Sequence, residues 1–192
     1  ALAHISGDQL DPAIARMQQP IALNKNKDSY YFELGALLER TGQYENAVRN
    51  MKRTIELNPT HSNAHNFLGY MYATQGKSLD EALHHLQKAL SIQPKNGYFY
   101  DSLGWIYYKR GEPERALEEL KKAMVYTPPD PVLYSHMGDV YFSLKNYSKA
   151  NQAWRNALSL TLEKMEDAKG EIPDPQDLEK KIHKAQGFLD RN

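Results

Sequence analysis

DSLGWIYYKRGEPERAL, Asp101 to Leu117, is the stretch of sequence that decides the fold. Its first ten residues, rich in aromatic and aliphatic side chains, are predicted to form a helix with Gly104 in the middle. A glycine inside a helix costs about 1 kcal/mol relative to alanine. Close approach of a second backbone would offset that cost, because glycine has no Cβ to block it. Gly104 therefore marks the helix face that contacts another segment.

The pattern around Gly104 recurs along the chain. Four glycines share one frame, at spacings of 34, 35 and 34 residues: Gly35, Gly69, Gly104 and Gly138. A large side chain follows each glycine three residues later, as Leu38, Tyr72, Tyr107 or Tyr141. The second half of each unit carries a small residue, Ala47, Ala82, Ala116 or Ala150, and the first three units close with Pro59, Pro94 and Pro128. A period of this length indicates a repeat protein.

These positions resemble the tetratricopeptide repeat motif, and the resemblance covers residues 28–164. It implies an all-α fold, a right-handed superhelical solenoid of antiparallel helix pairs with a C-terminal capping helix. The expected repeats are 28–61, 62–96, 97–130 and 131–169, the last with an extended second helix. A linker at 170–176 and a capping helix at 177–192 are expected to follow.

Within each repeat, the small residues predict how the two helices meet. Gly104 on the first helix, with Ala116 and Ala123 on the second, are expected to form the seam of a helical hairpin. Pro113 suits the first turn of a second helix, and Ser78 with Glu81 has the pattern of a capping box. Both features predict where second helices begin.

Residues 1–27 extend the repeat pattern backwards. The segment AIARMQQPIALNKNK aligns with AVRNMKRTIELNPTH of the first repeat, which predicts the second helix of a partial repeat. Pro20 stands where Thr54 does and would bend such a helix. An N-terminal cap is the alternative. From the partial repeat, we expect the chain to be a fragment of a longer array.

The C-terminal end departs from the repeat pattern. Leu162 stands where a closing proline is expected, so the preceding helix is predicted to continue through LTLEKMEDA. The last segment places apolar residues on one stripe: Leu178, Ile182, Ala185 and Leu189. A terminal repeat needs a cap with a polar outer face, and we interpret this segment as that cap. A partner-binding amphipathic helix is the alternative.

Composition and motifs favour no catalytic class. Lys plus Arg and Asp plus Glu each number 24, so no net charge favours nucleic acid. The chain has no cysteine, no glycine-rich phosphate loop and no nucleophile turn, and no apolar run is long enough for membrane insertion. His61 and His65 could face one metal from a helix, but His65 also occupies a packing position. We therefore expect no catalytic residue, no metal and no cofactor.

A second stripe on the first helices is the main functional signal. In the third repeat it comprises Tyr98, Asp101, Trp105, Tyr108 and Lys109, turned away from the Gly104 face. In tetratricopeptide arrays these positions line the concave groove, so the resemblance implies a partner-binding surface there. The other groove residues expected are Phe32, Asn63, Asn66, Tyr70, Asp139 and Phe142. For Trp105 and Tyr70, packing between neighbouring repeats is an equally weighted alternative, whereas Asn66, Tyr98 and Tyr108 are the favoured contacts.

These features predict a non-enzymatic scaffold that binds a peptide or partner segment in the groove. Aromatic rings give a large contact area with few rotatable bonds, and Asn can bond a peptide backbone as donor and acceptor. Phe32 and Ala36 stand where a chaperone-tail receptor of this family would carry lysine and asparagine, which disfavours that subclass. The sequences of the second and third repeats resemble those of bacterial repeat proteins, many of which are exported or membrane-tethered. Self-assembly through the N-terminal end and a regulatory role in a larger enzyme are the alternatives.

Overall fold

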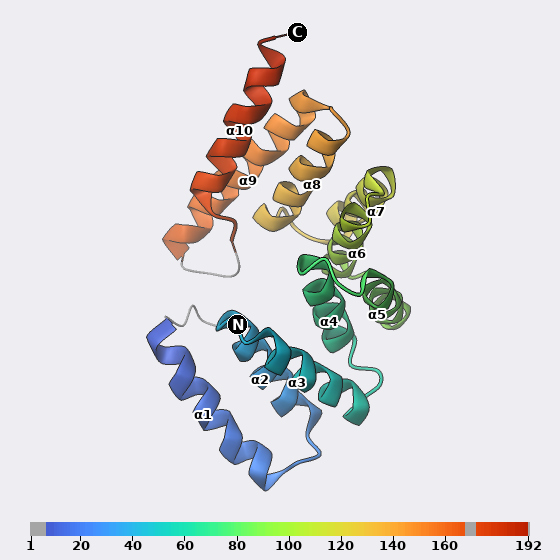
Figure 1. The fold of residues 1–192 in the computed structure, drawn as a ribbon, viewed down its shortest axis with the longest axis vertical. Helices are drawn as coiled ribbons and strands as arrows, with labels where there is room; N and C mark the ends of the chain where they lie inside the picture. The colour runs from blue at the N-terminus through green and yellow to red at the C-terminus, as the bar shows by residue number, and fades with distance from the viewer. Residues whose placement is uncertain (1–6, 168–171, 192) are drawn as a thin grey trace. The chain divides into compact units, whose positions relative to one another are not determined.

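The computed structural model describes residues 7–167 and 172–191, and all regular secondary structure in those ranges is helical (Figure 1). The chain divides into two compact units. The N-terminal unit, Ile5–Pro94, contains α1 Gly7–Leu23, α2 Asp28–Arg40, α3 Tyr44–Leu57, α4 Ser62–Thr74 and α5 Leu79–Ile92. The C-terminal unit, Lys95–Asn192, contains α6 Gly97–Lys109, α7 Pro113–Tyr126, α8 Pro131–Ser143, α9 Tyr147–Asp167 and α10 Pro175–Leu189. None of the described helices is long and apolar enough to cross a membrane.

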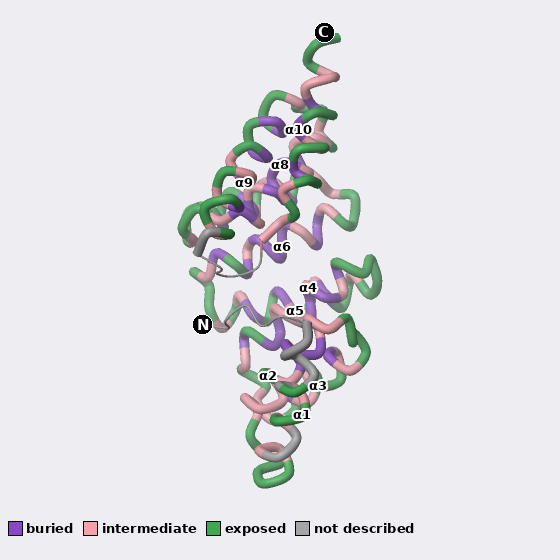
Figure 2. The backbone as a smooth tube through the Cα atoms, turned by 90° about the vertical axis from the view of Figure 1, so that its left-hand side faces the viewer, coloured by how far each residue is buried: buried purple, intermediate pink, exposed green. Residues whose placement is uncertain are grey.

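The helices pair as hairpins: α2 with α3, α4 with α5, α6 with α7, and α8 with α9. The seam of each hairpin carries the repeated glycine. A Cβ built on Gly104 would lie 2.8 Å from Leu120 Cγ and 3.0 Å from the backbone oxygen of Ala116, both on α7. Ala116, Leu120 and Ala123 are fully buried, which confirms the predicted seam. Figure 2 shows the buried segments running along these helices.

The turn between the two helices of each hairpin uses a left-handed residue. Gly42, Gly76 and Gly111 have φ values of +73°, +63° and +77°. The fourth hairpin has Lys145 at the equivalent position, with φ 60°. A residue with a Cβ in the left-handed backbone conformation costs about 1–2 kcal/mol relative to glycine, so the backbone is strained at Lys145.

The helix starts agree with the sequence only in part. Proline opens α7 at Pro113, as predicted, and the Asp130 carboxylate caps α8 by accepting from the backbone amides of Val132 and Leu133 at 2.9 and 3.3 Å. The predicted capping box at Ser78 is wrong. Ser78 has φ 48° and its side chain makes no cap hydrogen bond. The second hairpin has one extra residue in this turn, and a left-handed Ser78 takes up that residue.

Helices beyond the four hairpins occur at each end. In the N-terminal unit α1 packs against α2, and Ile14 contacts the core cluster of Leu38, Ala47 and Met71. Its assignment to a partial repeat stays a prediction.

In the C-terminal unit α9 has 21 residues against 14 for α7, in agreement with the predicted extension. Helix α10 packs on α9 and buries Leu178, Ile182 and Ala185 of the predicted stripe, whereas Leu189 is 37% exposed. The linker expected at 170–176 falls partly outside the described residues.

Candidate functional site

The N-terminal unit carries four predicted groove residues on α2 and α4. Phe32 is half-buried, and its ring centre lies 4.7 Å from that of His61 and 6.2 Å from that of Phe67. Asn63 is exposed, whereas Asn66 and Tyr70 are half-buried. These four side chains, two rings and two amides, thus range from half-buried to exposed.

Asn66 has an unusual feature. Its Oδ1 atom is buried and has no hydrogen-bond partner among the described residues. A buried acceptor without a partner costs about 1–3 kcal/mol, so its presence calls for an explanation.

In the C-terminal unit, α6 carries five predicted groove residues with different exposures. Tyr98 is 57% exposed and Lys109 is exposed, so both are open to a partner. Trp105 and Tyr108 are half-buried, and Asp101 is only 9% exposed. The exposed members therefore lie at the two ends of the helix.

The middle of α6 is engaged by the next hairpin. The Trp105 ring stacks on His136 of α8, with ring centres 4.2 Å apart and planes at 19°. Tyr108 stacks on Trp105 at 5.0 Å and 27°. Lys109 places its Nζ 4.8 Å from the Trp105 ring centre. We call Trp105, Tyr108 and His136 the Trp105 stack.

Asp101 holds His136 in place within the Trp105 stack. Its Oδ1 lies 2.9 Å from His136 Nδ1, and both side chains are largely buried. Burial alone would lower the pKa of His136, but the negative charge and hydrogen bond of Asp101, together with the charge of Asp139, raise it above the ordinary histidine value. The carboxylate therefore favours the protonated imidazole. Asp101, predicted as a groove contact, forms a buried pair with His136 between α6 and α8, and its contact with a partner stays a prediction.

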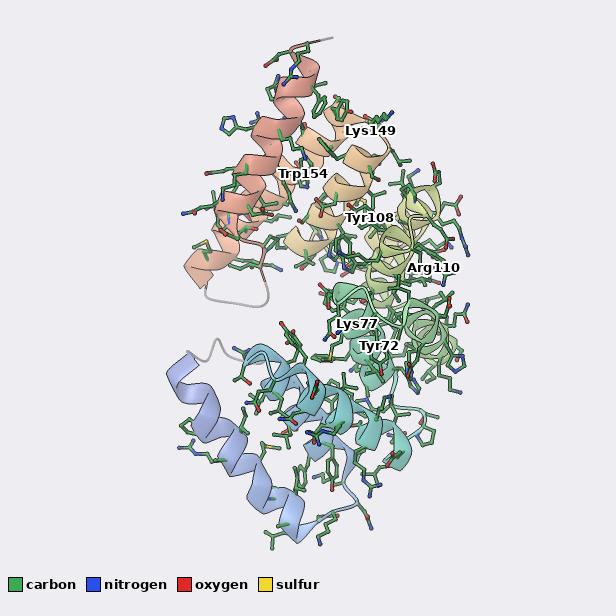
Figure 3. All side chains as sticks on the ribbon, viewed as in Figure 1. Tyr72, Lys77, Tyr108, Arg110, Lys149 and Trp154 are labelled. Atoms are coloured by element: carbon green, nitrogen blue, oxygen red, sulfur yellow. The ribbon has the colours of Figure 1, made fainter. Side chains whose placement is uncertain are left out.

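The last two predicted residues, Asp139 and Phe142 on α8, contact the C-terminal helices. The Asp139 carboxylate accepts from Trp154 Nε1 at 3.2 Å and pairs with Lys181 of α10 at 3.0 Å (Trp154 in Figure 3). Phe142 packs edge-on against Phe188 of α10, with ring centres 5.7 Å apart. Helix α10 thus already contacts both of these predicted positions.

The Trp105 stack also contains a polar atom without a partner. Trp105 Nε1 is buried and donates no hydrogen bond to any described residue. Burial, and then the negative charge of Asp139, raise the pKa of Tyr108, so its phenol stays protonated (Tyr108 in Figure 3). The stack therefore offers two donor groups on rigid aromatic rings, one of them unsatisfied.

The histidines of the N-terminal unit have structural roles. His61 Nδ1 caps α4 by accepting from the backbone amide of Ala64 at 3.1 Å. His65 Nε2 lies 3.2 Å from the Pro59 oxygen, and its Nδ1 lies 2.9 Å from Nδ1 of His85. Within residues 7–167 and 172–191, no group of three or more His, Cys, Asp or Glu side chains is arranged to hold a metal ion.

Sequence reasoning missed His136 and Lys181. The repeats give no signal for His136, because the equivalent residues are Ser102, Phe67 and Glu33, three unrelated side chains. Lys181 lies in the last helix, outside the repeat frame, so no alignment pairs it with Asp139.

Sequence profiles of the tetratricopeptide repeat family match residues 32–97, 85–118 and 104–145, which together cover more than half of the chain. The small glutamine-rich tetratricopeptide repeat-containing protein 2 of Mycosarcoma maydis is 26% identical over 92 residues, 48% of this chain and 26% of that protein. Anaphase-promoting complex subunit 3 of Schizosaccharomyces pombe is 31% identical over 74 residues, 38% of this chain and 11% of that protein. The chain thus spans about a quarter and about a tenth of the length of these two relatives.

A solved structure supports the fold. The crystal structure of a thermophilic TPR protein of Thermus thermophilus is 20% identical and has a TM-score of 0.72, with 93% of this chain and 91% of that chain covered. The predicted fold class, an all-α solenoid of helix pairs, is confirmed. Proteins with such repeats generally mediate interactions between proteins and are typically non-enzymatic. By its sequence profiles and its fold, the chain belongs to the tetratricopeptide repeat family.

Proposed function

We propose that the chain is a non-catalytic scaffold that binds a peptide or partner segment through the groove positions of its first helices. The observation that carries this proposal is an unsatisfied buried polar atom in each unit, Asn66 Oδ1 in the N-terminal unit and Trp105 Nε1 in the C-terminal unit. Both belong to residues that the sequence assigns to the groove. An extended peptide carries a group to match either atom, because a backbone amide can donate to Asn66 in the N-terminal unit and a backbone carbonyl can accept from Trp105 in the C-terminal unit.

Binding requires that covering side chains move. Lys109 is long and exposed, and it lies over the Trp105 ring, so it can swing aside without loss of buried packing. Recovering one buried hydrogen bond is worth about 1–3 kcal/mol to the complex. Tyr98 lies on the same helix, α6, and is 57% exposed. Its ring adds apolar contact area and is already accessible in the free protein.

The test begins with capture of partners by the tagged chain from cells that express it, followed by identification and a dissociation constant for the purified pair. Tyr98→Ala is expected to weaken binding about tenfold or more, as loss of an aromatic contact of about 1.4 kcal/mol or more would. Tyr44→Ala is the matched control, because Tyr44 is 47% exposed but lies on a second helix, α3.

Both variants remove an exposed side chain, so their melting temperatures should stay close to that of the parent. Equal weakening by the two variants, or none by Tyr98→Ala, would contradict a site on the first helices. Trp105→Ala is unsuitable for this purpose, since it also removes the stack on His136.

A further inference from the structure

His136 combines three features. It is 6% exposed, it shares a hydrogen bond with Asp101 from the preceding hairpin, and its ring lies almost parallel to that of Trp105. A histidine in such a place changes charge near neutral pH, where few other side chains do.

We infer that His136 is a proton-dependent positioning residue, which in its protonated state holds Trp105 in place on the C-terminal unit. This inference deepens the proposed function, because it makes the position of the Trp105 stack depend on pH. Its effect on partner binding rests on the proposed function. The positioning itself does not depend on any partner.

The charges around His136 favour the protonated state. Helix α6 contributes Asp101 at 2.9 Å, and α8 contributes Asp139. The cations nearby are Lys181 of α10, which is held by Asp139 and Asp177 at 3.0 and 3.2 Å, and Lys109 of α6 over the Trp105 ring. Burial lowers the pKa of His136, but the charge and hydrogen bond of Asp101, together with the charge of Asp139, outweigh burial and the charge of Lys181, so the pKa is raised.

Protonation strengthens the contacts of His136 with Asp101 and Trp105. An imidazolium forms a charge-assisted hydrogen bond with the Asp101 carboxylate and attracts the face of the Trp105 indole. Loss of the proton leaves a buried carboxylate with a weaker, neutral partner and removes the attraction between cation and ring. The support that His136 of α8 gives to the Trp105 and Tyr108 rings is then weaker.

The experiment is a titration of the full chain labelled with 5-fluorotryptophan, followed by fluorine NMR between pH 5 and 9. The Trp105 resonance, assigned by its loss in Trp105→Phe, should shift with a midpoint above the ordinary histidine value of 6.5. The inflection should vanish in His136→Gln. The matched control is His183→Gln, which removes an exposed histidine of α10 and should leave the inflection unchanged.

A second variant tests the role of Asp101. In Asp101→Asn the burial of His136 remains but the carboxylate is gone, so the midpoint should fall below 6.5. A carbon-13 titration of the His136 ring in the unmutated chain should give the same midpoint as the Trp105 resonance. A Trp105 resonance that does not titrate, that titrates unchanged in His136→Gln, or whose midpoint is unaffected by Asp101→Asn would overturn the inference.

For the effect on function, the dissociation constant of the captured partner is measured at pH 6 and pH 8.5. Binding should weaken at pH 8.5 for the parent, and this pH dependence should be absent in His136→Gln. A pH-independent affinity in the parent would overturn the regulatory part of the inference. If Tyr98→Ala does not weaken binding while the Trp105 resonance titrates as expected, the proposed function is refuted and the positioning role of His136 stands.

Discussion

Replacing Gly104 with alanine tests the packing that defines the fold. The added Cβ would lie 2.8 Å from Leu120 Cγ, 2.9 Å from Leu120 Cδ2 and 3.0 Å from the Ala116 oxygen. Leu120 is fully buried and the Ala116 oxygen is a backbone atom, so neither can give way without disturbing the core. Overpacking of this kind costs about 1–3 kcal/mol, while alanine improves helix propensity by about 1 kcal/mol. The expected net loss of stability is about 1 kcal/mol.

The matched control is Gly187→Ala in α10. A Cβ there would meet only the guanidinium Nη2 of Arg191, at 3.9 Å, so the propensity gain of about 1 kcal/mol should appear as added stability. Thermal unfolding followed by circular dichroism should then show a melting temperature about 2–4 °C lower for Gly104→Ala and slightly higher for Gly187→Ala. A higher melting temperature for both variants would refute the close-packing argument.

Three further predictions concern the turns, the caps and the histidines. Lys145→Gly should raise the free energy of unfolding by about 1 kcal/mol in urea titration, because it removes a left-handed side chain at φ 60°. Asp130→Ala should lower that free energy by about 1 kcal/mol through loss of the α8 cap, and Asp130→Asn, which can still cap, should recover most of the loss. Burial, and then the charge of His65, lower the pKa of His85 from 6.5 to about 4, so the folded protein resists protonation there. Stability should therefore fall as pH drops from 6.5 to 4, by on the order of 2–3 kcal/mol, and His85→Gln should flatten this dependence in urea titrations at each pH.

The repeat frame predicted the hairpin seams because a seam restricts residue size in every unit. Gly104 and Ala116 are small since a backbone passes close to them, and that restriction is visible in one sequence with four internal copies. The turn at Ser78 could not be predicted in the same way, because the extra residue there has no counterpart in the other units and its left-handed conformation leaves the hydroxyl away from the helix amides.

The groove residues were harder to predict than the seams. Position along α6 predicts a stripe of groove residues, which stays a prediction, but the spacing does not tell which of these residues a neighbouring helix covers. Asp101 and Trp105 contact His136, whose position carries a different side chain in each repeat, so the repeat frame gives no hint of a pair between α6 and α8. Tyr98, one turn before Asp101, has no such neighbour and stays exposed.

Photo-crosslinking from position 98 tests the central claim most directly. With Tyr98 replaced by a photoreactive phenylalanine derivative in cells that express the protein, irradiation should join the chain to a partner, seen as a discrete species of higher mass. The same derivative in place of Tyr44, at similar exposure on a second helix, should give no such species. Crosslinks from position 44 alone, or equal yields from both positions, would contradict a partner-binding surface on the first helices.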